Sequence, residues 1–216
     1  RRPAGANSPQ IDSGRPPGLP RNALPDAVVL NTHEIEEVRV VTVARGLSHP
    51  WGMAFLPGGD MLVTERQGRL RMVRNSALDP EPVDGVPVVL SRGLAGLMDV
   101  ALHPDFLRNR LVYLSYTRPL GETEGTVALV RGRLDGMALR DVEDVFVAES
   151  WGGSTASARI AFAPDGLLYM TVGGAFGTNP GESKAQNPNS HAGKVLRLRD
   201  DGTVPDDNPF VGRDGY

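Results

Sequence analysis

Short segments of apolar or alternating apolar and polar residues recur along the chain, separated by turn residues. The clearest set follows Trp51, where we predict strands over residues 52–56, 61–65 and 69–74. Pro57-Gly58-Gly59-Asp60 separates the first two segments, and Gln67-Gly68 separates the second from the third. Short segments between turns of this composition are typical of an antiparallel meander.

The same pattern occurs twice more, in the same order. The second copy covers residues 98–105, 111–116 and 127–134, and the third covers residues 159–166, 167–172 and 194–198. Pro57, Pro104 and Pro164 mark equivalent turns, so the repeat is roughly 50 residues long, close to the length of a propeller blade. The alternative is three unrelated hairpins of a β-sandwich. The ordered repeat favours an all-β fold, a β-propeller with about three blades in this chain.

The segments between these strands complete the predicted blades. We expect residues 88–90 to begin the second blade and residues 144–148 to open the third. Residues 173–191 form a long polar stretch rich in Gly, Asn and Pro, and such loops are usually functional or disordered. A closed propeller needs at least four blades. We therefore expect either that the natural polypeptide continues past Tyr216 or that a second chain completes the ring.

The start of the chain differs in composition. Residues 1–26 contain six prolines and no apolar run, so they cannot form a core of their own. We predict two parts: residues 1–37 as a proline-rich extended arm, and residues 38–216 as the propeller part. The arm would be a linker, or a strap that docks on the propeller or on a partner. Residues 38–44 are predicted to be a strand, which could pair into the last blade and close the ring.

Composition excludes several functions. The formal net charge is −3 over 216 residues, without the basic surface that nucleic-acid binding requires. No apolar run reaches the ~18 residues that a membrane-spanning helix needs, and no signal segment is visible. There is no cysteine, which excludes disulfides and thiolate chemistry. Dinucleotide-binding, P-loop and α/β-hydrolase motifs are also missing.

A few polar residues are candidates for chemistry. His49 and His103 each precede a proline and are expected to be hydrogen-bonded turn residues. His191 is expected to anchor the start of a strand, with a position facing the central channel as the alternative. Four acidic turn residues could bind Ca²⁺ weakly, although acidic turns usually face solvent; they are Asp200, Asp201, Asp206 and Asp207.

Four phrases together resemble a known family. They cover residues 46–70, 96–116, 159–173 and 191–210, and they resemble the soluble aldose sugar dehydrogenases that use pyrroloquinoline quinone (PQQ). The resemblance implies a six-bladed propeller, of which this chain is the N-terminal half. It also implies hydride transfer from the anomeric carbon of an aldose to PQQ, a histidine as general base, and Ca²⁺ that polarises the quinone. A periplasmic or extracellular location is implied in the same way.

The residues at the family's site positions differ from the family pattern. The resemblance puts Thr155 at the position of the general-base histidine, four residues before Arg159. Gly174 stands where an aspartate orients that histidine, and Leu94 stands where a glutamine contacts the cofactor. A threonine hydroxyl is not basic near neutral pH. Arg159 is expected to pair with a carboxylate, with direct substrate contact as the alternative.

Two functions remain open at this point. The first is a PQQ-dependent sugar dehydrogenase that acts on a small sugar. The second is a propeller without catalytic activity that serves as a binding or assembly subunit, partnered by another protein or by the remaining propeller half. Since a fold does not determine a function, the site has to decide between them.

Overall fold

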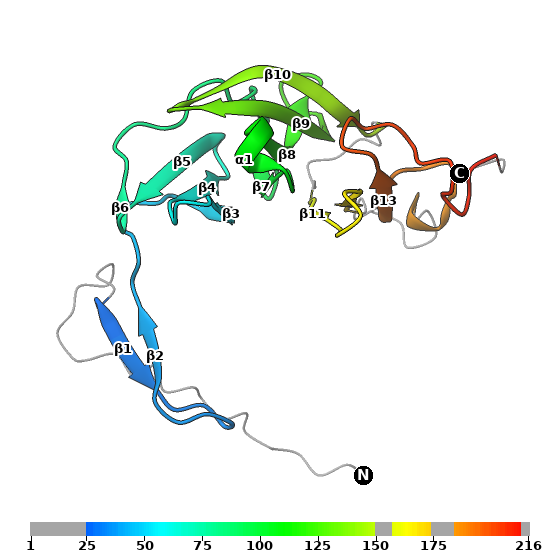
Figure 1. Cartoon of the computed structure of the whole chain (residues 1–216). Helices are drawn as coiled ribbons and strands as arrows, with labels where there is room; N and C mark the ends of the chain where they lie inside the picture. Colours follow the sequence, from blue (N-terminus) through cyan, green and yellow to red (C-terminus); the bar gives the residue numbers. More distant parts are fainter. Residues whose placement is uncertain (1–24, 150–156, 174–183, 213–216) are drawn as a thin grey trace, which may run out of the picture. The chain divides into compact units, whose positions relative to one another are not determined.

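The computed structural model describes residues 25–149, 157–173 and 184–212 (Figure 1). Its contacts divide the chain into two units, Arg1–Val43 and Ala44–Tyr216. This division lies beyond residue 37, where the arm was expected to end. Within the described residues no helix is long and apolar enough to cross a membrane.

The first unit contains a two-stranded antiparallel hairpin. β1 (Ala27–Leu30) pairs with β2 (Val38–Val41), and residues 42–44 are not in a strand. The part of the arm just before residue 38 is therefore not extended throughout. β2 pairs with β1 because residues 31–37 turn the chain back on itself.

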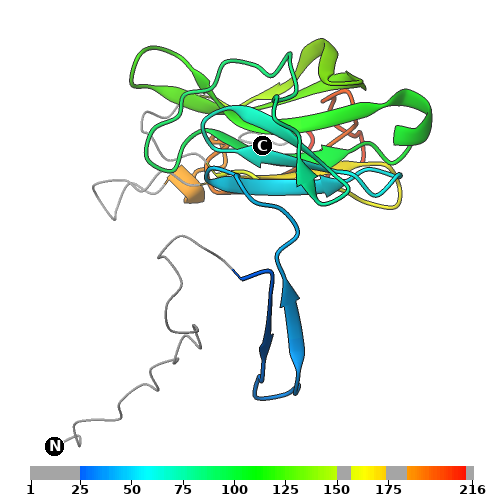
Figure 2. The ribbon, with the colours of Figure 1, turned by 90° about the vertical axis from the view of Figure 1, so that its left-hand side faces the viewer.

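The described residues of the second unit form three antiparallel sheets that follow one another in sequence order (Figures 1 and 2). The first sheet has the order β3 (Pro50–Phe55), β4 (Met61–Glu65), β5 (Arg69–Arg74), β6 (Ala77–Leu78). The second has the order β7 (Leu97–Leu102), β8 (Leu111–Pro119), β9 (Gly125–Asp135), β10 (Ala138–Val147). The third contains, within the described residues, β11 (Ile160–Phe162), β12 (Leu168–Val172) and β13 (Lys194–Leu198).

All nine repeated strands that the pattern predicted are present, but the sheet boundaries need two corrections. Residues 88–90 do not begin the second sheet; they form no strand, and Leu90 donates one backbone hydrogen bond to Thr117. Residues 144–147 do not open the third sheet; they end β10, the outer strand of the second. Register shifts in β10 between Arg140 and Glu143 and between Asp144 and Phe146 disturb the alternation that would have identified this strand.

In the part of the chain that the structure describes, two short helices also join the strands. The helix α1 (Phe106–Asn109) follows β7, and the 3₁₀ helix η1 (Lys184–Gln186) precedes β13. Phe106 is the one buried residue of α1 and joins the core between the first two sheets. The proline-rich connection after β5 also contains a two-residue strand, β6.

The second sheet is covered on both faces, because alternate side chains of β8 enter two different cores. Leu114 packs with Leu62 and Leu70 of the first sheet. Tyr113, its neighbour, packs with Leu168 of the third sheet. Side chains on successive strand residues point to opposite faces, so one strand can serve two apolar layers. This packing brings the innermost strands β3, β7 and β11 next to one another.

Candidate functional site

The starts of the three innermost strands meet at one end of the sheets, which we call the strand-start end. Asp99, near the start of β7, is buried, and its Oδ2 accepts a hydrogen bond of 2.9 Å from the backbone N–H of Ile160 in β11. Its backbone N–H donates to Ser115 Oγ at 3.0 Å. A carboxylate held in this way is a fixed negative charge between the second and third sheets.

Arg159 is positioned by this carboxylate. Its Nε lies 3.4 Å from Asp99 Oδ2, and its side chain remains 67% exposed. Its guanidinium carbon lies 5.9 Å from the centre of the Trp51 ring, within reach of a cation–π interaction. The expectation that Arg159 pairs with a carboxylate is confirmed. The pairing also leaves a fixed, partly exposed cation beside an indole at the strand-start end.

Gly52 allows β3 to approach this cluster closely. A Cβ atom at Gly52 would lie 2.6 Å from Asp99 Oδ1. The backbone N–H of Gly52 instead donates to Thr64 Oγ1 at 2.9 Å, and this hydroxyl donates in turn to the carbonyl of Met98. The first and second sheets are thus joined by hydrogen bonds directly beside Asp99.

Leu94 lies in the loop before β7, at the same end. Arg66 fixes this loop to the first sheet, since its Nη1 donates to the Gly93 carbonyl at 2.7 Å and its own carbonyl accepts from Leu97 N–H at 2.9 Å. Gly96 has φ 153°, and a Cβ there would lie 2.0 Å from the Arg66 carbonyl oxygen. The Leu94 side chain is 65% exposed. It presents an apolar group at the position where the resemblance implied a glutamine.

Two histidines lie at the strand-start end, and both use Nδ1 as a hydrogen-bond acceptor. His49 Nδ1 lies 2.8 Å from Gln67 Nε2, which can only donate. His191 Nδ1 accepts from the backbone N–H of Glu149 at 3.1 Å, and its ring meets Phe146 edge-on at 5.1 Å. The neutral form of each ring therefore carries its proton on Nε2, and its basic lone pair is already engaged. His191 does anchor the segment before β13.

Thr155 and Gly174 lie outside the described residues. At the edges of the described segments, Gly173 donates a backbone hydrogen bond of 2.8 Å to the carbonyl of Ser157. A Cβ at Gly173 would lie 2.2 Å from Ser157 Oγ, so the backbone at Gly173 lies close to Ser157.

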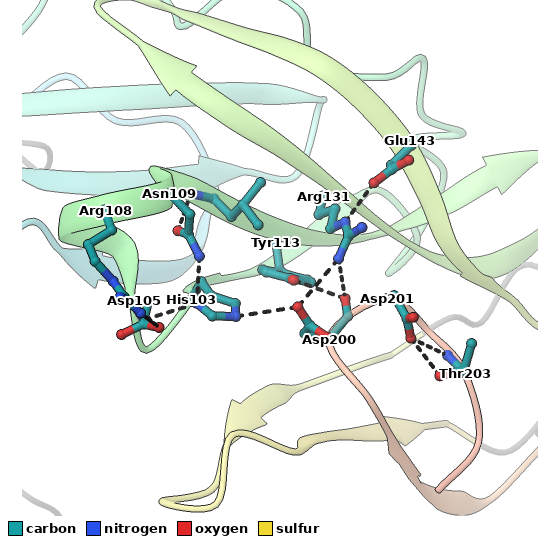
Figure 3. A network of polar contacts seen from close by, with 11 residues as sticks. His103, Asp105, Arg108, Asn109, Tyr113, Arg131, Glu143, Asp200, Asp201 and Thr203 are labelled. Carbon is teal, nitrogen blue, oxygen red and sulfur yellow. Dashed lines mark hydrogen bonds and ion pairs between the residues drawn. The ribbon is translucent and has the colours of Figure 1, made fainter.

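The four acidic turn residues lie at the opposite end of the sheets, and each has a protein partner. Asp200 Oδ2 lies 3.5 Å from His103 Nε2, and the Asp200 carbonyl accepts from Tyr113 Oη at 2.9 Å and from Arg131 Nη1 at 3.0 Å (Figure 3). Because Asn109 Nδ2 and the Asp105 N–H both point at His103 Nδ1, the neutral ring directs its N–H toward Asp200. These contacts connect the second sheet to the turn that follows β13.

The other three acidic residues are held locally. Thr203 donates two hydrogen bonds to Asp201 Oδ1, at 2.6 and 2.9 Å, and these lower the pKa of Asp201. Asp206 pairs with Arg199 at 3.2 Å. Asp207 pairs with Arg197 at 2.7 Å, which lowers the pKa of Asp207. In the part of the chain that the structure describes, no group of three or more His, Asp or Glu side chains could hold a metal ion.

Sequence reasoning overlooked Asp99 and Trp51, which complete the arrangement around Arg159. A signal was available for the first of them. Asp99 interrupts the apolar run of residues 97–102, and a carboxylate inside a buried strand requires a cation or N–H partner. The partner itself lies 60 residues further along, in another sheet.

The sequence profile of the family described as "Glucose / Sorbosone dehydrogenase" matches residues 47–216. An uncharacterized protein of Synechocystis sp. is 39% identical, with 94% of this chain and 53% of that protein covered. The Escherichia coli aldose sugar dehydrogenase is 36% identical, with 82% of this chain and 48% of that protein covered.

Solved structures agree with the sequence matches. The apo form of the soluble E. coli aldose sugar dehydrogenase superposes with a TM-score of 0.72 at 35% identity, over 79% of this chain and 49% of that chain. The PQQ-bound aldose sugar dehydrogenase of Streptomyces coelicolor superposes with a TM-score of 0.67 at 32% identity, over 88% of this chain and 54% of that chain. The chain thus spans about half the length of the relatives it matches. The chain belongs to the glucose/sorbosone dehydrogenase family, and its sheets are blades of a β-propeller.

Proposed function

We propose that the whole protein oxidises aldose sugars with PQQ, and that the part described here contributes to binding rather than to proton abstraction. The observation that carries this proposal is the Asp99–Arg159–Trp51 arrangement at the strand-start end. It occurs in a chain that is 32% identical to a protein whose solved structure holds PQQ.

The side chains of Arg159 and Trp51 match two features of PQQ, its carboxylate groups and its flat ring. PQQ is a flat quinone with carboxylate groups, so it suits an exposed guanidinium beside an indole ring. Arg159 and Trp51 would hold it, with Asp99 keeping the guanidinium in place. When bound, PQQ supplies the acceptor for the hydride from the anomeric carbon, and Ca²⁺ would polarise it.

Neither the two histidines at the strand-start end nor Thr155 supplies a general base. A general base must present a free lone pair close to the sugar hydroxyl. His49 and His191 both use their Nδ1 lone pair for hydrogen bonds, and Thr155 has a neutral hydroxyl. We infer that the sugar proton is taken by a group in the rest of the protein.

A second function is favoured by Leu94. An apolar side chain that is 65% exposed at the loop before β7 offers no hydrogen bond to a quinone and suits contact with another molecule's apolar surface. On this proposal the protein is a propeller without turnover that serves as a binding or assembly subunit.

Reconstitution of the whole protein separates the two functions. PQQ and Ca²⁺ are added, the protein is desalted, and retained quinone absorbance is measured before glucose or another aldose and an artificial electron acceptor are supplied. Sugar-dependent reduction that requires PQQ supports the oxidoreductase. Retained PQQ without turnover, or no retention at all, supports the binding subunit.

The resemblance to the family also suggests where the whole protein is located. We propose the periplasm or the cell exterior, and the absence of cysteine suits an oxidising compartment. Fractionation of the native host, with the protein detected by antibody, tests this; recovery in the cytosolic fraction alone would contradict it.

A further inference from the structure

A cavity of about 380 Å³ opens on the outer part of the second sheet. Pro87 and Val88 of the connection between the first two sheets form one wall. Val130 of β9 and Val142 of β10 form the apolar part of the other wall. The volume lies within the range of pockets that hold small organic molecules.

Tyr116, in β8, contributes a phenol to the lining of this cavity. The residue is only 3% exposed and lines the cavity. Within the described residues its hydroxyl makes no hydrogen bond. Burial raises the pKa of Tyr116, and the charge of Asp144 raises it further, so the phenol is neutral and can both donate and accept. A hydroxyl that borders the cavity and has no protein partner can bind a ligand or water there.

The charges at the mouth of the cavity compensate one another. Arg118 and Asp144 form an ion pair there, and both side chains line the cavity. Glu143 is paired with Arg131 at 2.7 Å. An anionic or cationic ligand would have to break one of these pairs. A neutral ligand with several hydroxyl groups can instead donate to Asp144 and accept from Arg118 while both remain paired.

The edge strand β10 is not suited to pairing with a strand of another protein, so such a strand is not a suitable occupant of this cavity. β10 has two register shifts, and Asp141 has a positive φ of 53°. It also carries Arg140, Glu143 and Asp144 beside these irregularities. Bulges and charges on an edge strand oppose the pairing of a further strand. These features of β10 therefore favour a small molecule as the occupant of the cavity.

We propose that the cavity lined by Tyr116, Arg118 and Asp144 binds a neutral polyhydroxylated ligand of the sugar and sugar-alcohol class. The valine and proline walls contact the C–H groups of such a ligand, and the three polar side chains bind its hydroxyls. None of the Asp99, Arg159 and Trp51 side chains lines this cavity, so the proposal does not depend on the proposed oxidation.

The test uses the full-length protein with ¹³C-labelled valine methyl groups. D-glucose and sorbitol are titrated separately, and the methyl shifts of Val88, Val130 and Val142 report on this cavity alone. We expect saturable shifts with a Kd in the range of roughly 1–10 mM, as for a few hydrogen bonds at an open site. Sodium gluconate serves as the charged probe and should shift these methyl groups less than D-glucose does.

Two variants complete the test. Tyr116→Phe keeps the ring and removes only the hydroxyl, so it should weaken binding about fivefold to tenfold. Tyr169→Phe, on β12 of the third sheet, is the matched control and should leave the affinity unchanged. Absence of saturable shifts with both neutral probes, an equal affinity in Tyr116→Phe, or stronger binding of gluconate would each overturn the proposal. Val142→Trp provides a second check, since it fills the cavity from a partly exposed position and should abolish the shifts of Val88 and Val130.

Discussion

The carboxylate of Asp99 in β7 accepts a 2.9 Å hydrogen bond from the backbone N–H of Ile160 in β11, which joins two blades through one buried atom. The same oxygen lies 3.4 Å from Arg159 Nε. One side chain thus contributes both to the packing of two blades and to the position of an exposed cation.

Replacing Asp99 by alanine should destabilise the protein. The substitution leaves the Ile160 N–H buried without an acceptor, which costs about 1–3 kcal/mol. Asp99→Asn retains a carbonyl acceptor and should cost less. The measurement is the free energy of unfolding of the full-length protein in urea. Asp206→Asn, at a side chain that is 98% exposed, is the control. Equal stabilities of Asp99→Ala and this control would contradict the proposed role of Asp99 in joining β7 to β11.

Gly96→Ala should be more harmful than Gly93→Ala, although the two glycines belong to the same loop. A Cβ at Gly96 would lie 2.0 Å from the Arg66 carbonyl oxygen, whereas a Cβ at Gly93 has nothing within 4 Å. Both have positive φ, so both substitutions carry a conformational cost of about 1 kcal/mol. Only Gly96→Ala adds a clash, and we expect at least a further 1–2 kcal/mol, roughly the cost of a displaced backbone segment. Thermal unfolding of the two variants side by side measures the difference.

Glu65 should contribute to acid sensitivity. Burial alone would raise the pKa of Glu65, but hydrogen bonds from Ser48 N–H and Arg69, together with the charges of Arg69 and Arg71, lower it overall. A carboxyl whose pKa is lowered in the folded state stabilises the protein above its unfolded pKa of about 4.3. This stability is lost as the pH falls from there through the lower pKa of the folded state.

The experiment compares wild type and Glu65→Gln from pH 7 to pH 2. Wild type should be the more stable protein near neutral pH, and the difference between the two should shrink below about pH 4.3. A constant difference across the whole range would show that Glu65 stabilises the fold without a contribution from its ionisation.

Leu94→Gln should strengthen quinone binding if the proposed oxidation is right. The side chain is 65% exposed, so the substitution should leave the stability nearly unchanged while it adds a hydrogen-bonding group. We expect PQQ affinity to increase about threefold to tenfold, the range that one hydrogen bond supplies. Equilibrium dialysis of the whole protein with PQQ and Ca²⁺ measures this.

Leu107→Gln is the matched control for this comparison. Leu107 lies on α1 and is also exposed, at 79%, but it belongs to the opposite end of the sheets. The control should leave PQQ binding unaltered. If the two variants respond alike, Leu94 does not face the cofactor.

Local pattern predicted the strands well wherever turns were marked by glycine or proline. The bounds of β4 and β5 match the prediction, since Pro57 to Asp60 and Gln67-Gly68 define both ends of β4. β10 was assigned to the wrong sheet, because two register shifts and a run of charged residues remove its alternation. Such irregularities depend on the partner strand, and a single segment does not reveal them.

The candidate site was predicted only in part, for a related reason. The sequence identified Arg159, and even the need for a carboxylate partner. It did not identify Asp99, because the pair spans two sheets and forms only once β7 lies beside β11. The acidic turns illustrate the same limit: Asp200 and Asp207 were predicted as possible calcium ligands, and the sequence did not reveal the arginines that lie beside them in the folded chain.

The burial of the second sheet on both faces also determines how the chain can open. Its strand β8 is shielded by the first sheet through Leu114 and by the third through Tyr113, so solvent should reach the β8 amides only after a neighbour has separated. Opening should therefore proceed from the flanking sheets inward, and the β8 and β9 amides should exchange with deuterium last. A proteolytic cut in either flanking sheet would leave the middle one as the last element to lose its protection.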